Sequence, residues 1–378
     1  MRVPTPVLLL LVTALAVSAA MAATPRPPDP MQGPGIGPMQ QPPPGEHVDK
    51  YGDLAEKPYR PEWAPLPLLW ADTAPVVYLH ELIDSENADE RARAAFLLGQ
   101  IGCPDSLPLL AECLNDAERS VRVQAGIALA CMGDARGKHT CAAVLSTHAE
   151  WIRYFAALGL SRLLGQDIDR PFITRALKGA MSGQSAMMTQ TIDGAVKGAP
   201  LPPPVENLPD QAPTAPAPSP EQIWEGAADV FVAESDWWFH KGDYDQAIRC
   251  SEASIFLDPD YVETYTVVAW LEWSMGQNAQ AVRTLNRAIA ANPDDPESHA
   301  GLGAHYFNIK EYALAEEPLK KAVELGADHL IHRTYAHCLE ALGKLRESLA
   351  EWERLLETRP SDGAIRLNRD QLKERLSE

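Results

Sequence analysis

The sequence predicts an all-α protein: two α-solenoids, each a stack of helix pairs, joined by a proline-rich linker. Small residues, turn glycines and closing prolines recur in steps of 34, 34 and 33 residues between about residues 228 and 362, with Ala327 in place of one closing proline. A separate recurrence of 31 residues precedes it, between residues 91 and 165. Fixed periods of this size are typical of solenoids, in which each helix pair buries its apolar face against the next pair.

The first 22 residues are typical of a secretory signal peptide. Arg2 supplies a positive charge, residues 7–17 form an apolar run, and residues 20–22 (Ala-Met-Ala) fit a cleavage site. The apolar run is too short for a stable membrane-spanning helix, so we favour a cleaved signal over an uncleaved anchor. We therefore expect a bacterial protein that is periplasmic or secreted, with no membrane insertion after cleavage.

Residues 23–60 are rich in proline, glycine, glutamine and methionine. Such a segment buries too little apolar surface to offset the entropy of ordering, and we expect it to be disordered. A proline- and alanine-rich linker follows later, at residues 198–220, and this composition favours an extended, semi-rigid chain. We expect it to separate two arrays that need not pack together.

Residues 61–197 form the first array. Three segments align at Arg91, Arg122 and Arg153, and each has apolar residues at helical spacing and ends at a glycine. Shorter helical stretches lie between them, and residues 167–198 are a degenerate fourth unit. This block resembles the HEAT-like repeats, which implies an α-solenoid. Some members of that class attach or isomerise bilin chromophores, but nothing in this sequence singles out a bilin site.

Residues 221–378 form the second array, with four units and a terminal helix. The expected helix pairs are 223–241 with 245–257, 262–276 with 278–291, 297–309 with 312–325, and 330–342 with 345–358. Gly242, Gly276 and Gly343 occupy the turns, and Lys310 replaces the glycine in the third unit. Residues 241–259 show the pattern most clearly, and the stretch resembles the tetratricopeptide repeats. Residues 364–376 would be the polar capping helix that an open stack requires.

The charge of the chain limits its partners. It has 33 Lys and Arg against 52 Asp and Glu, a formal net charge of −19. Such a chain is repelled by nucleic-acid phosphates and anionic lipid head groups, so we expect no nucleic acid as ligand. A neutral or basic protein or peptide is the expected partner.

Six cysteines follow the signal peptide, and four of them lie between residues 103 and 141. An even number in an exported protein permits disulfides, so one or two bridges are expected in that stretch. Cys250 and Cys338 fall in different repeats, and we expect them to be buried thiols. No CxxC pair or histidine spacing indicates a metal site.

No motif in the sequence indicates catalysis. His80 and Glu81 lack the second histidine of a zinc-protease helix, and there is no Gly-x-Ser-x-Gly elbow. We therefore expect no enzymatic activity, no catalytic residues, no cofactor and no metal.

The first helix of each hairpin in the second array is expected to line its concave side. Helical spacing places nine candidates for a peptide groove there: Asp236, Phe239, His240, Trp270, Trp273, Phe307, Asn308, Arg333 and His337. Aromatic side chains offer contact area at low entropic cost, which predicts a groove for an extended or helical peptide. Packing between neighbouring hairpins is an equal interpretation for Trp270 and Trp273, and core packing is favoured for Phe239 and Phe307.

Together these features are typical of an exported scaffold or adaptor that binds protein partners through concave solenoid surfaces. Two alternatives from other classes are open. The HEAT-like block could be a lyase or another cofactor-handling enzyme, or the aromatic groove could bind a cell-wall polymer.

Overall fold

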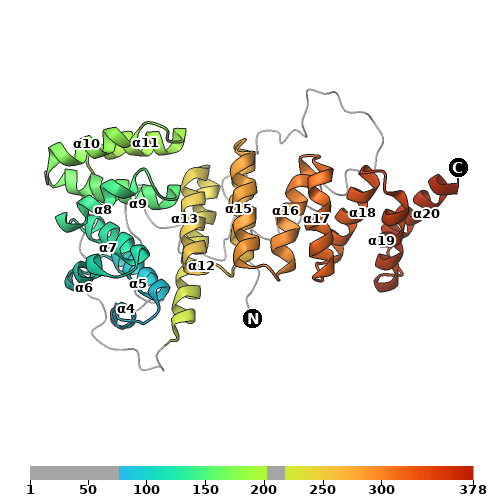
Figure 1. The fold of residues 1–378 in the computed structure, drawn as a ribbon, viewed down its shortest axis with the longest axis horizontal. Helices are drawn as coiled ribbons and strands as arrows, with labels where there is room; N and C mark the ends of the chain where they lie inside the picture. The colour runs from blue at the N-terminus through green and yellow to red at the C-terminus, as the bar shows by residue number, and fades with distance from the viewer. Residues whose placement is uncertain (1–75, 202–217, 378) are drawn as a thin grey trace, which may run out of the picture. The chain divides into compact units, whose positions relative to one another are not determined.

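The computed structural model describes residues 76–201 and 218–377 of the chain (Figure 1). Within these two stretches all regular secondary structure is helical, which confirms the predicted all-α solenoid. The described helices form two compact units, α4 to α13 and α14 to α20. The expected signal peptide, the expected disordered segment and most of the expected linker lie outside the described residues.

The first unit begins with eight helices that correspond to the 31-residue recurrence. They are α4 (Val76–Leu82), α5 (Ala88–Ile101), α6 (Leu107–Glu112), α7 (Arg119–Cys131), α8 (Lys138–Val144), α9 (Glu150–Gly165), α10 (Arg170–Ala180) and α11 (Ala186–Ala195). The three aligned segments are α5, α7 and α9. A Cβ at Gly99 of α5 would lie 2.4 Å from the Cβ of Ala128 on α7, so only glycine permits this helix crossing.

Two of the three recurring arginines tie a long helix to the loop before it. Arg91 donates to the backbone oxygen of Ser85 at 2.8 Å and forms an ion pair with Asp116, whose carboxylate lies 2.8 Å away. Arg122 donates to the backbone oxygen of Asp116 at 2.6 Å. The guanidinium groups of Arg91 and Arg122 thus satisfy loop carbonyls at the helix starts, which gives these two arginines a structural role. Arg153 instead lies 3.4 Å from Glu150 of its own helix.

Two further helices, α12 (Pro220–Lys241) and α13 (Tyr244–Leu257), belong to the same compact unit. Phe96 of α5 lies at the centre of their contact with the preceding helices. Its ring centroid is 5.8 Å from Phe231 of α12, 5.6 Å from Phe256 of α13 and 5.5 Å from Phe155 of α9. The first hairpin of the 34-residue array therefore shares one core with the HEAT-like helices, although the expected linker lies between them in the sequence.

The second unit contains the remaining hairpins: α14 (Val262–Ser274), α15 (Asn278–Ala291), α16 (Pro296–Asn308), α17 (Tyr312–Glu324), α18 (His329–Ala341), α19 (Leu345–Thr358) and α20 (Gly363–Ser377). The bounds agree with the expected pairs to within two residues. The turn glycines adopt left-handed backbone conformations, with φ of 78° at Gly276 and 75° at Gly343. Lys310 takes the same conformation, with φ of 66°, although it has a Cβ.

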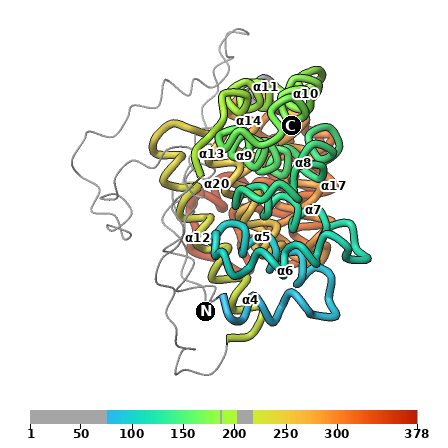
Figure 2. The backbone as a smooth tube through the Cα atoms, turned by 90° about the vertical axis from the view of Figure 1, so that its left-hand side faces the viewer, coloured from blue at the N-terminus to red at the C-terminus, as the bar shows by residue number. Residues whose placement is uncertain are grey.

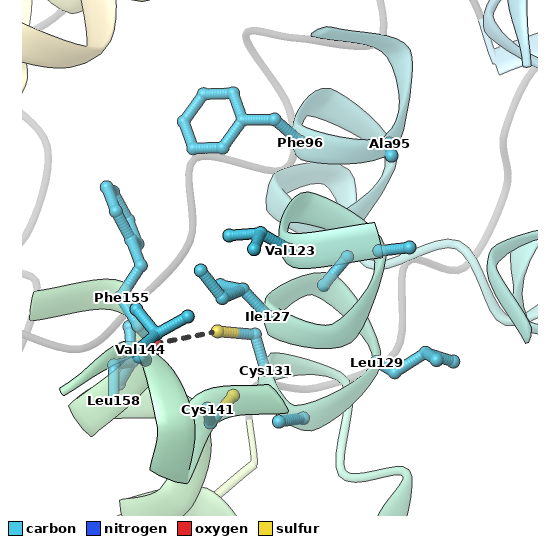
Figure 3. Close-up of a cluster of buried hydrophobic side chains, with 14 of the residues drawn as sticks. Ala95, Phe96, Val123, Ile127, Leu129, Cys131, Cys141, Val144, Phe155 and Leu158 are labelled. Atoms are coloured by element: carbon cyan, nitrogen blue, oxygen red, sulfur yellow. Dashed lines mark hydrogen bonds between the residues drawn. The ribbon is translucent and has the colours of Figure 1, made fainter. Parts of the chain in front are cut away.

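The expected disulfides are not formed, and this expectation is wrong: all six cysteines are free thiols. Cys131 and Cys141 lie in the apolar core between α7, α8 and α9 (Figure 3). Each sulfur instead faces a backbone oxygen, Cys131 that of Phe155 at 3.6 Å and Cys141 that of Gly126 at 3.7 Å. Burial raises the pKa of both thiols, which keeps them protonated and unreactive.

Among the described helices, none combines the length and the apolar character that crossing a membrane requires.

Candidate functional site

The nine predicted groove residues divide between the two compact units. Asp236, Phe239 and His240 lie on α12, in the first unit. The other six lie on the first helices of three consecutive hairpins in the second unit. We call these six the first-helix face: Trp270 and Trp273 on α14, Phe307 and Asn308 on α16, and Arg333 and His337 on α18. None of the six is fully buried.

The first-helix face repeats because the hairpins repeat. Trp273 and Phe307 occupy the same position in successive units, 34 residues apart, and Trp270 and His337 share another position. At that second position α16 carries the small residue Ala304, which is only 8% exposed. Large side chains on α14 and α18 therefore flank a small residue on the helix between them.

Trp273 and Phe307 each rest against a neighbouring ring. Trp273 meets the edge of His305 on α16, with ring centroids 6.3 Å apart. Phe307 meets Tyr312 of α17 at 5.5 Å. Trp273 thus packs between neighbouring hairpins, which is one of the two interpretations. Its ring is also partly exposed, as the peptide-groove interpretation requires. The two interpretations are compatible for this residue.

Polar contacts position His337 at the α18 end of the face. Its ring centroid lies 4.9 Å from that of Trp352, and its Nδ1 lies 3.7 Å from a carboxylate oxygen of Glu340. Arg375 of α20 forms an ion pair with the same carboxylate. The hydrogen bonds from His337 and Arg375 lower the pKa of Glu340, so this carboxylate is ionised at neutral pH.

Carboxylates gather at the starts of α14, α16 and α18. Asp295 caps α16 by accepting from the backbone nitrogen of Glu297 at 2.7 Å, and Asp328 caps α18 by accepting from that of Leu330 at 2.8 Å. Loss of solvent raises the pKa of Glu297, and the charges of Asp328, Asp295 and Glu263 raise it further. Negative charge is therefore concentrated along this edge of the second unit.

The three predicted residues on α12 form a local group within the first unit. His240 contacts Asp236 twice, through the carboxylate at 3.4 Å and through the backbone oxygen at 2.8 Å. The ring of Phe239 lies 5.6 Å from that of Tyr244 across the hairpin turn. These contacts hold the three side chains in place on the last turns of α12.

Sequence reasoning did not identify the buried polar contacts behind these helices. Glu272 departs from the usual apolar residue at its position and is only 4% exposed. It accepts a hydrogen bond from Thr284 Oγ1 at 2.8 Å, which makes burial of its carboxylate possible. In residues 76–201 and 218–377, no three His, Cys, Asp or Glu side chains are arranged to hold a metal ion.

Paired helices at fixed periods define the class of this protein as a helical repeat scaffold. Residues 76–161 match the family model for HEAT repeats, and residues 269–329 match that for the tetratricopeptide repeat. Both resemblances are thereby confirmed. No curated protein matches the chain.

Several solved structures match part of the chain. The crystal structure of MamA protein is 20% identical, covers 39% of this chain and 81% of its own, and has a TM-score of 0.34. The first TPR of Spaghetti (RPAP3), bound to an HSP90 peptide, is 22% identical, with coverages of 32% and 95% and a TM-score of 0.28. The first TPR domain of human RPAP3 is 23% identical, with coverages of 31% and 94% and a TM-score of 0.28. Similarities of this size carry no argument about partners.

Proposed function

We propose that this protein is an exported, non-catalytic scaffold that binds a peptide segment of a partner protein on the first-helix face. One observation carries the proposal. Three aromatic rings on α14 and α16 are partly exposed: Trp273 and Phe307 at matching positions of consecutive hairpins, and Trp270 one helical turn before Trp273. Aromatic residues with polar neighbours are the composition that dominates the energetics of protein interfaces.

The arrangement suits an extended or helical peptide better than a small molecule. The six residues are spread over three helices, and a segment lying across the hairpins would contact them in succession. The rings would contact apolar groups of the segment, while Asn308 and Arg333 could bond its backbone carbonyls. Such binding requires no chemistry at the surface, which agrees with the absence of a catalytic motif in the sequence.

A basic segment fits this surface best. Glu263, Asp295, Glu297 and Asp328 place negative charge at the starts of α14, α16 and α18, and Lys or Arg side chains of a segment that reaches this edge would be attracted to it. Tryptophan rings also attract cations through their faces. We therefore propose a partner segment that carries several Lys or Arg residues, in agreement with the net charge of −19.

Replacing both tryptophans tests the proposed surface. The Trp270→Ala/Trp273→Ala variant should bind the partner at least about 10-fold more weakly, because large aromatic contacts at interfaces contribute more than 1 kcal/mol each. Leu314→Ala is the matched control, since Leu314 is 54% exposed on a second helix, α17. Affinity would be measured by titrating each variant with synthetic basic, neutral and acidic peptides and with the captured partner.

Photo-crosslinking gives a second readout. A crosslinking amino acid at Asn308 should trap the bound segment, whereas the same group at Leu314 should not. If the double variant keeps its helical circular dichroism and binds as tightly as the wild type, the first-helix face is not the binding surface.

Export is proposed separately and has its own test. The apolar run at residues 7–17 and the Ala-Met-Ala sequence at residues 20–22 support removal of a signal peptide. Sequencing the N-terminus of the protein purified from bacterial periplasm should find a chain that starts at Ala23. A chain that starts at Met1 and stays in the cytoplasm would refute export without affecting the peptide surface.

A further inference from the structure

The outer face of α13 differs in environment from the same face of the other second helices. Gln246 and Arg249 of α13 are 6% and 7% exposed. One repeat later, 34 residues on, α15 carries the same two residue types as Gln280 and Arg283. There the arginine is exposed and donates to Gln280 of its own helix at 3.0 Å. Side chains of the same type at equivalent positions are therefore buried in one hairpin, whereas in the next the arginine is exposed and the glutamine is partly buried.

A third position on this face differs in sequence. Phe256 of α13 corresponds to Ala290, Glu324 and Glu357 in the three later second helices, all of which are exposed. The equivalents of Gln246 and Arg249 in α17 and α19 are also exposed: Leu314, Glu317, Glu347 and Ala350. Only the first hairpin therefore carries an outer face suited to burial. We call Gln246, Arg249 and Phe256 the docking face.

The polar members of the docking face bond to α9 and α11 of the HEAT-like block. Arg249 donates to Thr191 Oγ1 at 2.8 Å, and its guanidinium carbon lies 4.1 Å from the centroid of the Tyr154 ring. Gln246 donates to the hydroxyl of Tyr154 at 3.3 Å. A buried guanidinium is strongly disfavoured without such partners, so these contacts fix one orientation of the hairpin.

The apolar member completes an aromatic cluster. Phe256 lies 5.3 Å from Trp151 of α9 and 5.6 Å from Phe96 of α5, measured between ring centroids. On α12, Phe231 stacks on Phe96 at 5.8 Å, and Arg93 of α5 lies over the ring of Trp224. Figure 2 shows α12 and α13 beside α5 and α9. Both helices of the hairpin thus contribute large rings to a core shared with the HEAT-like block.

We propose that the α12–α13 hairpin is an interaction module for the HEAT-like block, and that the docking face and its aromatic neighbours hold the two together without the covalent connection at residues 202–217. The docking face binds α5, α9 and α11 of the same chain. The two parts would then stay associated after the connection is cut.

Cutting the full-length chain tests the proposal. A recognition sequence for a site-specific protease would be inserted within residues 202–217, and the cut protein would be passed over a size-exclusion column. Both pieces should elute together at the position of the uncut protein. Elution as two separate peaks, or precipitation of either piece after cutting, would overturn the proposal.

Matched variants show whether the docking face carries the association. Arg249→Met/Phe256→Ala should weaken the association of the cut pieces about 100-fold, so that they separate at micromolar concentration. Arg283→Met alters the equivalent arginine of the next hairpin and should leave them together. Circular dichroism of the uncut variants would show that both units stay folded. Co-elution of the cut double variant would refute the assignment of this face.

Discussion

Lys310 occupies a backbone conformation that favours glycine, and replacing it should stabilise the second unit. Its φ of 66° lies in the left-handed region, where a Cβ costs roughly 1–2 kcal/mol. The hydrogen bonds of the turn match those of a glycine turn. Lys310 N donates to Phe307 O at 3.0 Å, and Gly276 N donates to Trp273 O at 2.8 Å. The Cβ is therefore the relevant difference between the two turns.

The expected gain follows from two opposing terms. Lys310→Gly removes the strain of roughly 1–2 kcal/mol but adds about 0.4–1 kcal/mol of chain entropy to the unfolded state. The free energy of unfolding should therefore rise by up to about 1.6 kcal/mol, with about 0.8 kcal/mol as the middle of the range. Lys310→Ala keeps the Cβ and should change stability by less than about 0.5 kcal/mol, because the lysine side chain is exposed.

Urea-induced unfolding, followed by far-ultraviolet circular dichroism, would measure both variants against the wild type. Gly276→Ala is the converse control, and it should lower the free energy of unfolding by about 1 kcal/mol or more. If Lys310→Gly is no more stable than the wild type, the left-handed backbone of Lys310 does not destabilise the second unit. If Lys310→Ala is stabilised as much as Lys310→Gly, the gain comes from removing the lysine side chain and not from relief of backbone strain.

Two further predictions concern α16. Gly303→Ala should lower the free energy of unfolding by about 1–3 kcal/mol, because the new Cβ would lie 2.9 Å from the backbone nitrogen of Leu319. Gly301→Ala is the control: its new Cβ would lie 3.0 Å from a methyl group of Leu285, a flexible side chain, so it should lower the stability less. Thermal unfolding of the two variants would measure the difference. Burial lowers the pKa of His305 below 6.5, so its neutral form stabilises the fold above about pH 6.5 and this contribution is lost as the pH falls towards the folded-state pKa. His305→Phe should therefore reduce the loss of stability between pH 7 and 5, measured by urea-induced unfolding at each pH. If the variant loses as much stability as the wild type over this range, protonation of His305 does not cause the loss.

Much of the hairpin architecture could be predicted from sequence because its determinants are local. Glycine in three of the four hairpin turns, helical spacing of apolar residues and a constant period specify where each helix begins and ends. The observed bounds agree to within three residues at the start of α12 and to within two elsewhere in the array. Trp273 and Phe307 were placed on the first-helix face for the same reason, since equivalent positions in a repeat face the same way. Their assignment to binding stays a prediction.

The cysteines show a limit of that reasoning. Their number and spacing permitted disulfides, but the formation of a bridge depends on the distance and direction of two Cβ atoms. That geometry follows from how α7, α8 and α9 pack, and Cys131 and Cys141 instead face backbone oxygens. Composition and spacing contain no information on that packing.

The sequence by itself determined the repeat, because small residues, turn glycines and closing prolines act within one hairpin. Only the tertiary structure decided which hairpin faces are buried. Gln246 and Arg249 match Gln280 and Arg283 in residue type and repeat position, yet only the first pair is buried. Burial depends on what lies next to a surface in space, and for α13 those neighbours are Tyr154 and helices from a different repeat class.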